Sequence, residues 1–317
     1  MALPHLAEEW PDLGAARREV LQLAAAIART EPVLLLVPQG ETDETALPPG
    51  VRALPATYGD AWTRDTAPLV ASEDGRPIAL AFTFDGWGGR YLMEGDAEVA
   101  AQLARAHALP LRRSALVGEG GGVELDGAGT LLVTRDSWLR SPRANPPDEA
   151  TVGAALAELL GVRRVLWGEG ALRNDHTDGH VDTLVRFVRP GEVVVMEPGP
   201  EDPNAPMLLD LRRQLEGHQD AAGRRLEVHR IPSPGAVHDA EGALLPASYV
   251  NYYLANAQVL VPAYGVPADE AAQRALARLF PARRVTPIPA RAILGGGGAV
   301  HCVTHQIPRL PGLTLPG

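Results

Sequence analysis

The sequence predicts an α/β protein, because stretches with the period of an amphipathic helix are repeatedly followed by short apolar runs of strand length. Five such helix-then-strand units follow one another along the chain. Proline and glycine are spread throughout rather than gathered in a linker, so we expect a single domain over residues 1–317. A circular arrangement of the five units and an open doubly wound sheet both explain this order.

Each unit begins with a predicted helix. In the first, residues 15–29 place Val20 and Leu23 at helical spacing, and in the third Asp148 is suited to cap a helix that Gly161 ends. The predicted helices are 15–29, Asp96–His107, the segment from Asp148 to Gly161, Met207–Leu215 and Ala268–Phe280.

A predicted strand follows each helix, and further strands lie between the units. The strands after the helices are Val33–Val37, Leu111–Val117, Val162–Trp167, Leu226–Ile231 and Arg283–Ile288. The others are Pro77–Phe84, Thr130–Thr134, Thr183–Val188, Glu192–Met196 and Gln258–Val261. The polar motifs fall between these elements, one cluster per unit, as expected for a central site built from loops of a repeated scaffold.

The composition excludes several classes of protein. An apolar fraction of 45% supplies a core, which argues against disorder, and a formal net charge of −10 argues against nucleic acid as a partner. We find no leader and no apolar run of membrane-spanning length. With one cysteine in the chain, a disulfide framework is excluded and the cytoplasm is the expected compartment.

That cysteine, Cys302, follows the glycine run Gly295–Gly298 near the end of the sequence. Four glycines contribute nothing to a core, so we expect them to let the chain approach something closely. Taken alone, Cys302 is better explained by an inert buried thiol than by a reactive one, because lone buried cysteines are common. The polar clusters elsewhere in the chain favour the reactive interpretation.

The densest of these clusters runs from Asp175 to Asp182. Alternation predicts a strand with His176, Asp178, His180 and Asp182 on one face, and such ligands suit Mn, Fe or Zn. Four ligands on one face would crowd a single ion, however, and no second cluster completes the site. We therefore favour acid–base chemistry by His180 and Asp182 beside Cys302 as the nucleophile.

A second polar cluster, Trp62–Asp65, offers an aromatic face and a carboxylate. Together they would hold a guanidinium group by a cation–π contact and paired hydrogen bonds. A buried contact between Arg64 and Asp65 with Trp62 in the core is the structural alternative. The glycine runs lack the spacing and the lysine of a phosphate-binding loop.

Taken as a set and in this order, the motifs resemble those of the agmatine deiminase and bacterial peptidyl-arginine deiminase family, over about Trp62 to Pro308. They are Trp62-Thr63-Arg64-Asp65-Thr66-Ala67-Pro68, Glu119-Gly120-Gly121 with Asp126-Gly127-Ala128-Gly129-Thr130, Thr177-Asp178-Gly179-His180-Val181-Asp182, Ala247-Ser248-Tyr249-Val250-Asn251-Tyr252-Tyr253, and Gly295-Gly296-Gly297 with His301-Cys302-Val303-Thr304.

This resemblance implies the guanidine-modifying, or pentein, fold: a five-bladed α/β propeller of ββαβ repeats. The first repeat is expected to be shortened, because Trp10-Pro11 passes almost directly into the first helix. The resemblance makes Cys302 the nucleophile, His180 the general acid and base, and Asp65 and Asp182 the carboxylates that hold the guanidinium. Neither a metal nor another cofactor is expected.

The further residues for which we expect a role in substrate binding are Trp62, Asp178, Glu119 and Asn251, the last three either at the substrate tail or behind the residues that touch substrate. The implied function is hydrolysis of a small guanidine, with agmatine giving N-carbamoylputrescine and ammonia through a covalent amidino-cysteine, a step of polyamine (putrescine) biosynthesis.

Two alternatives remain: a deiminase of peptidyl or free arginine, and a non-catalytic guanidine-binding member of the fold, suggested by Ala67 and by the Gly298-Ala299 pair. The expected partner is the small cationic guanidine, with no nucleic acid and no membrane; a homo-oligomer is left open.

Overall fold

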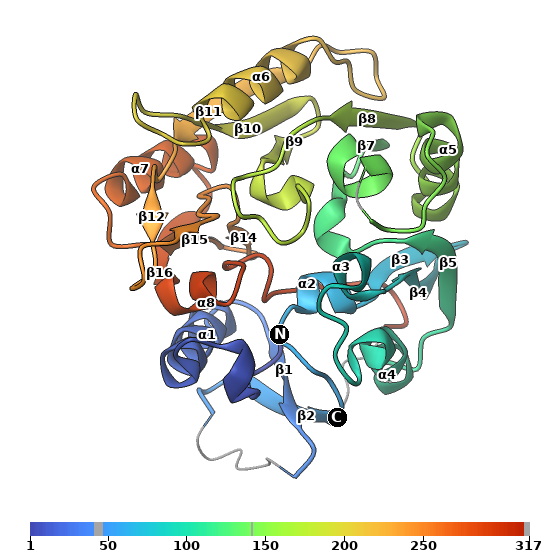
Figure 1. Cartoon of the computed structure of the whole chain (residues 1–317). Helices are drawn as coiled ribbons and strands as arrows, with labels where there is room; N and C mark the ends of the chain where they lie inside the picture. The colour runs from blue at the N-terminus through green and yellow to red at the C-terminus, as the bar shows by residue number, and fades with distance from the viewer. Residues whose placement is uncertain (41–46, 141, 314–317) are drawn as a thin grey trace.

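The computed structural model describes residues 1–40, 47–140 and 142–313 (Figure 1). The helices are α1 (Leu13–Ala28), α2 (Thr63–Thr66), α3 (Gly86–Gly89), α4 (Val99–Ala106), α5 (Glu149–Leu160), α6 (Ala205–Glu216), α7 (Asp269–Leu279) and α8 (Arg291–Gly295). Short 3₁₀ segments are η1 (Ala7–Glu9), η3 (Asp96–Glu98), η4 (Gly120–Gly122) and η6 (Val181–Thr183), and a π-helical turn, η5, covers Asp136–Arg140.

The strands that make up the larger sheets are β1 (Val33–Pro38), β2 (Val51–Ala56), β3 (Leu69–Glu73), β4 (Arg76–Thr83), β5 (Leu111–Val117), β6 (Glu124–Leu125), β7 (Thr130–Thr134), β8 (Arg164–Gly168), β9 (Val185–Arg189), β10 (Glu192–Glu197), β11 (Glu227–Pro232), β14 (Tyr253–Leu254), β15 (Gln258–Ala263) and β16 (Arg284–Pro289). Each strand predicted after a helix or between the units is present in the structure, whereas β2, β3, β6 and β14 were not predicted. A separate pair, β12 (Val237–His238) and β13 (Leu244–Leu245), forms a short hairpin.

Four sheets of the described ranges share one plan. In the sheets β3-β4-β5, β6-β7-β8, β9-β10-β11 and β14-β15-β16, the middle strand pairs antiparallel with the strand before it. It pairs parallel with the strand after it, and one long helix, α4, α5, α6 or α7, connects that parallel pair. Four of the five helix-then-strand units of the sequence are therefore ββαβ units.

The first unit has a smaller sheet. Strands β1 and β2 pair in parallel, and across β1 the only further pairing in the described part of the chain is a single bridge between Ala2 and Leu36. This sheet has no antiparallel hairpin among the described residues, which agrees with the shortening expected for the first unit.

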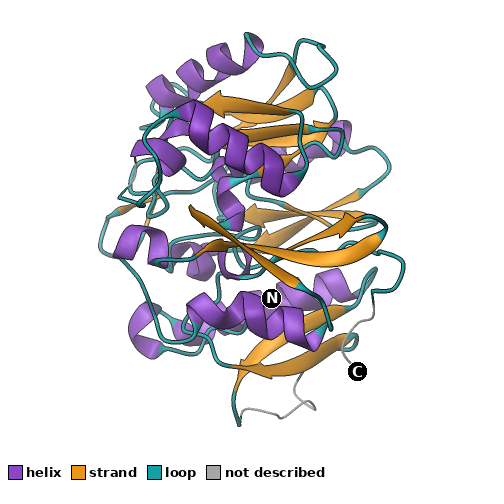
Figure 2. Ribbon diagram, turned by 90° about the vertical axis from the view of Figure 1, so that its right-hand side faces the viewer, coloured by secondary structure: helices purple, strands orange, loops and turns teal. Residues whose placement is uncertain are grey.

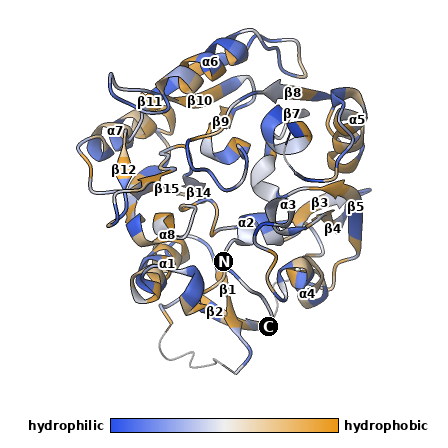
Figure 3. Ribbon diagram, in the orientation of Figure 1, coloured by the Kyte–Doolittle hydropathy of each residue, from blue (hydrophilic) through white to orange (hydrophobic). Residues whose placement is uncertain are grey.

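Capping and packing explain where the helices begin and which face they bury. Asp148 accepts a hydrogen bond from the Thr151 amide (2.8 Å) at the start of α5, and Gly161 ends the helix with a φ of +66°, as predicted. Helix α1 buries Val20 and Leu23 in the largest apolar cluster. Figure 3 shows that helices such as α1 and α6 carry both apolar and polar residues. No helix of the described ranges has both the length and the apolar character that crossing a bilayer requires.

The long helices α1, α4, α5, α6 and α7 lie around the rim in Figure 1, while α2 and α8 lie nearer the middle. Figure 2 shows the helices packed beside the strands at successive levels of the molecule. The loops and short helices that carry the polar motifs therefore come together away from the outer rim.

Candidate active site

Cys302 lies in a turn that packs against the short helix α2. The Arg64 amide donates a hydrogen bond to the Cys302 carbonyl (3.0 Å), and the Thr63 hydroxyl donates one to the Val303 carbonyl (3.1 Å). The Cys302 side chain is buried, with its Sγ atom 3.3 Å from Nδ2 of Asn251 and 3.9 Å from Oδ2 of Asp182. The sulfur therefore sits among polar groups from three separate segments.

Asp182 presents a carboxylate that is only partly hydrogen-bonded. Its Oδ2 atom lies 2.6 Å from Nδ1 of His301 and 3.3 Å from Nδ2 of Asn251. Its Oδ1 atom is buried and has no hydrogen-bond partner within the described ranges. A buried oxygen without a donor is costly, so an N–H group brought to this atom would be favourable.

Asp65 and His180 form a second group of polar side chains next to this one. The two side chains approach to 3.7 Å between Oδ1 of Asp65 and Nδ1 of His180. Asp65 accepts hydrogen bonds from the Gly121 amide (2.9 Å) and from Nε1 of Trp87 (3.0 Å). On the other side of the imidazole, Nε2 of His180 lies 3.1 Å from Glu119.

The expectation that His180 and Asp182 share one face of a strand is wrong. Asp175–Asp182 forms a tight turn that leads into the 3₁₀ segment η6, and the strand begins only at Val185. Asp175 accepts hydrogen bonds from the Thr177 and Gly179 amides, and Gly179 has a φ of +87°. Side chain-to-backbone bonds of this kind favour a turn over an extended strand.

A cavity of about 330 Å³ opens beside the sulfur. Its lining includes Asp65, Cys302, Trp62, Trp87 and the glycine run 295–298. We call it the substrate cavity. Asp65 and Cys302 therefore share one cavity, as the sequence predicted. His180 and Asp182 do not line this cavity, but His180 contacts Asp65 and Asp182 contacts Cys302.

The glycines at the cavity have the close contacts expected of them. A Cβ atom on Gly298 would lie 2.6 Å from Trp62 and 3.0 Å from the Cβ of Cys302. One on Gly121 would lie 2.6 Å from Nδ1 of His180 and 2.7 Å from Oδ1 of Asp65. These positions have no room for a side chain.

The other predicted residues lie around this group. Trp62 lines the cavity, donates to Asp60 (2.7 Å) and stacks on Trp10 with ring centroids 5.3 Å apart. Arg64 and Asp65 do not form the buried pair considered above, because Asp65 faces the substrate cavity and the Arg64 side chain lines a different one.

The remaining candidates, Asn251, Glu119 and Asp178, do not line the substrate cavity. Asn251 contacts Cys302 directly, Glu119 lies beneath His180, and Asp178 pairs with Arg90 (2.8 Å). Of the two roles considered for these three residues, a place behind the residues nearest the cavity fits their positions.

Burial and neighbouring charges set the protonation of the site. Burial lowers the pKa of His180, but Asp65 and Glu119 outweigh it and raise that pKa to about 9. Burial raises the pKa of Asp182 to about 7. Burial, together with Asp182 and Asp65, raises the pKa of the Cys302 thiol well above its usual value. Without a ligand, the site therefore holds a neutral thiol beside a cationic imidazole.

Three residues that contact the predicted site residues were not identified from the sequence. Trp87 donates to Asp65, Arg143 pairs with Glu119 (2.8 Å), and His301 hydrogen-bonds Asp182. Nothing local in the sequence marks Trp87 or Arg143. His301 had one signal, its position directly before Cys302.

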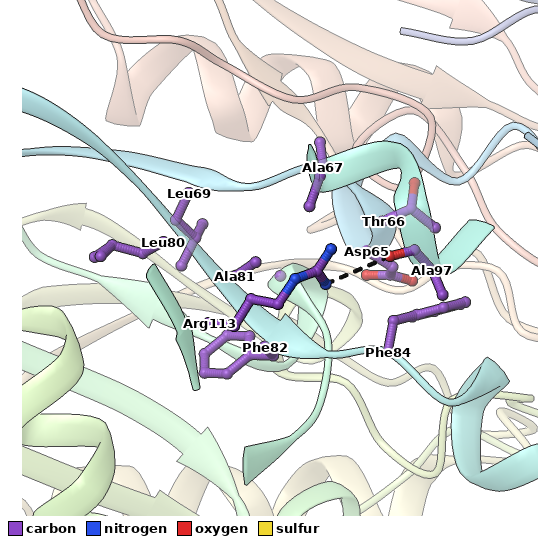
Figure 4. A pocket seen from close by; sticks show the side chains of 12 residues that line it. Asp65, Thr66, Ala67, Leu69, Leu80, Ala81, Phe82, Phe84, Ala97 and Arg113 are labelled. Atoms are coloured by element: carbon purple, nitrogen blue, oxygen red, sulfur yellow. Dashed lines mark hydrogen bonds between the residues drawn. The ribbon is translucent and has the colours of Figure 1, made fainter. Parts of the chain in front are cut away.

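Two other features of the described residues are separate from the substrate cavity. The side chains placed closely enough to hold a metal are Glu192, Glu227 and His229, and none of the residues 175–182 belongs to such a group. Figure 4 shows a small void between Asp65 and Arg113; at about 10 Å³ it has room for one water at most.

Comparison with known proteins places this geometry in a family. The structure of an agmatine deiminase from Enterococcus faecalis superimposes with a TM-score of 0.90, at 29% identity, over 98% of this chain and 92% of that one. Fold and site together thus define a pentein-type deiminase.

More specifically, the chain belongs to the Porphyromonas-type peptidyl-arginine deiminase family, whose model matches residues 1–308. A relative in Streptomyces coelicolor is 38% identical over 94% of this chain and 91% of its own length. An agmatine deiminase of Stutzerimonas stutzeri is 36% identical over 97% of this chain and 92% of its own length.

Proposed function

We propose that this protein is a hydrolase that deiminates agmatine to N-carbamoylputrescine and ammonia, with Cys302 as a covalent nucleophile. The observation that carries the proposal is the buried Oδ1 atom of Asp182, which has no hydrogen-bond partner among the described residues. The sulfur of Cys302 is 3.9 Å from Oδ2 of the same carboxylate. A planar cation with N–H groups supplies the missing donor and brings its central carbon to the sulfur.

Two carboxylates would hold the guanidinium group. Asp182 offers its free oxygen, and Asp65, fixed by Trp87 and Gly121, offers the remaining lone pairs of a carboxylate on the cavity wall. The positive charge of the substrate opposes the burial that raises the pKa of the Cys302 thiol, so binding itself promotes formation of the thiolate.

The chemistry then proceeds in two halves. The thiolate attacks the guanidinium carbon, His180 donates its proton to one terminal nitrogen, and ammonia leaves, with the remaining amidine carbon bonded to sulfur. Neutral His180 next takes one proton from water, whose oxygen bonds to that carbon. The C–S bond then breaks, the Cys302 thiolate leaves, and the hydroxyl proton passes to solvent or to the released ammonia as the C=O bond of the ureido product forms. Glu119 and Arg143 act as positioning residues, because they hold the imidazole and stabilise its charge.

The cavity lining favours agmatine over arginine. It contains Glu8 and Glu9, which suit the amine end of agmatine, and no arginine or lysine that would pair with an α-carboxylate. Two arginines elsewhere in the described structure, Arg90 and Arg135, are paired with Asp178 and Glu149 respectively. The names of the relatives from Enterococcus and Stutzerimonas support the same choice.

We extend the proposal to fold, partners and location. We propose that the ββαβ units close into a five-bladed propeller within one domain, and that the protein works in the cytoplasm, in putrescine biosynthesis. Its partner is the small guanidine rather than nucleic acid or a membrane. The mechanism calls for no metal or other cofactor, because a thiolate and an imidazole supply the nucleophile and both proton transfers.

An ammonia-release assay on agmatine, free arginine and a blocked arginine peptide tests this function. We expect release from agmatine, little from the other two, and none from Cys302→Ala with any of them. Preference for arginine or for the peptide would replace the substrate assignment. Release from none of the three, with guanidine binding retained, would favour the non-catalytic alternative.

A further inference from the structure

A second cavity, of about 300 Å³, lies behind the active site and shares no lining residue with the substrate cavity. We call it the back cavity. In two pairs of consecutive residues, one residue lines each cavity. Asp65 and Cys302 line the substrate cavity, while their chain neighbours Arg64 and His301 line the back cavity.

The guanidinium of Arg64 lines the back cavity and has few hydrogen-bond partners. Its side chain is buried (3% exposed) and donates one hydrogen bond, from Nε to the His301 carbonyl (3.4 Å). Its Nη2 atom is buried and without a hydrogen-bond partner in the described part of the chain. Asp182 and Asp65 attract this charge, but neither accepts a hydrogen bond from it.

Most of the other charged groups of this cavity already have hydrogen-bond partners. Glu124 accepts from Nε of Arg186 (2.8 Å) with one oxygen and from the Phe187 amide (2.9 Å) with the other. Oδ1 of Asp126 accepts from two amides of its own loop, whereas its Oδ2 is buried without a hydrogen-bond partner in the described part of the chain. The third arginine of the lining, Arg189, is paired with Glu192.

The lining of the cavity carries three arginines and two carboxylates, so it has one more cation than anions. Arg186 has Glu124 as its counterion and also donates to the Tyr252 carbonyl (2.9 Å). Among the described residues, Arg64 forms an ion pair with neither carboxylate of the lining. Burial and the neighbouring charge of Arg186 lower the pKa of Arg64 to about 10, which leaves it a cation at neutral pH. An uncompensated buried cation is unfavourable, and a bound anion would relieve it.

We propose that the back cavity binds a small oxyanion, of the phosphate, sulfate or carboxylate class, through the guanidinium of Arg64. The planar fork of a guanidinium matches two oxygens of such an anion, which favours an oxyanion over a halide. This site is distinct from the site of deimination, since it takes a ligand of opposite charge in a separate space.

Crystals soaked in selenate, a heavier analogue of sulfate, test the site directly. An anomalous peak within hydrogen-bond distance of the Arg64 guanidinium is expected. A back cavity without that peak, or with ordered water alone, overturns the proposal.

Thermal stability in solution provides a second test. Inorganic phosphate should raise the melting temperature of the wild-type protein above its value in sodium chloride of equal ionic strength. Gln306 is exposed and lines the back cavity, so Gln306→Glu adds a competing carboxylate there without disturbing the core. We expect it to raise the half-saturating phosphate concentration by about tenfold or more.

Gln22→Glu, which places the same charge on the exposed side of α1, is the matched control. Its half-saturating phosphate concentration should equal that of the wild type. If the wild-type protein responds to ionic strength alone, or if both variants respond equally, the oxyanion site is refuted.

Discussion

The Oδ2 atom of Asp182 lies 3.9 Å from the sulfur of Cys302, and the other oxygen of that carboxylate is buried without a hydrogen-bond partner in the described part of the chain. Burial, Asp182 and Asp65 raise the pKa of this thiol. In the proposed mechanism, the substrate cation would satisfy the carboxylate and lower the pKa of the thiol in the same binding event.

Replacing Asp182 with Asn should reduce kcat/KM for agmatine by about a hundredfold or more, because one of the two anions that hold the guanidinium is lost. Asp74→Asn, in an exposed turn, is the matched control and should leave kcat/KM unchanged. Activity of the Asp182 variant equal to that of this control would remove Asp182 from the site.

The same variant should be more stable than the wild type at alkaline pH. Burial raises the pKa of Asp182 from 3.8 to about 7, so the folded state binds its proton more tightly than the unfolded state does. Its contribution to stability is present at low pH and is lost as the pH rises through about 7. Melting curves at pH 6 and pH 8.5 should therefore show that the difference between wild type and variant grows at the higher pH.

The pH profile of kcat/KM should be bell-shaped, with limbs near pH 7 and pH 9. Asp182, whose pKa is about 7, must be ionised to bind the cation, and His180, whose pKa is about 9, must keep its proton for the leaving nitrogen. Ammonia release measured across this range gives both limbs. An optimum below pH 6 would contradict these protonation states.

Glu119→Gln should move the alkaline limb to lower pH by about one unit or more, because Glu119 raises the pKa of His180 through a 3.1 Å contact. Glu98→Gln, at an exposed carboxylate, is the control and should keep the wild-type limb. A purely structural role for Glu119 would instead lower the rate equally at all pH values.

Gly298→Ala should lower kcat/KM by about tenfold to a hundredfold, since the new methyl group would lie 2.6 Å from Trp62 and 3.0 Å from the Cβ of Cys302. Gly199→Ala serves as the control, because a Cβ there meets nothing within 4 Å. Equal rates for the two variants would mean that the cavity wall yields without displacing the nucleophile.

The sequence predicted the elements better than it predicted the contacts between them. The cap at Asp148 and the ending at Gly161 depend on residues a few positions apart, and both were correct. In contrast, the hydrogen bond of Trp87 to Asp65 spans 22 residues and that of His301 to Asp182 spans 119. The helical or strand periodicity of a sequence carries no information about contacts between residues so far apart.

The error over residues 175–182 has a local cause. Alternation of polar residues indicated a strand, but the side chain of Asp175 accepts backbone and hydroxyl hydrogen bonds that close a turn. Asp65, His180, Asp182 and Cys302 were nevertheless predicted together, because their motifs were interpreted as a set. The unpaired charge of Arg64 could be recognised only once its surroundings were known.

The most direct test of the central claim is the rate of ammonia release from agmatine by Cys302→Ser, with agmatine binding to the same preparation followed by calorimetry. We predict that kcat/KM falls by at least about 10³-fold while agmatine still binds, because the two carboxylates that hold the cation are intact. A variant that binds agmatine and releases ammonia at a rate within tenfold of the wild type would contradict the account.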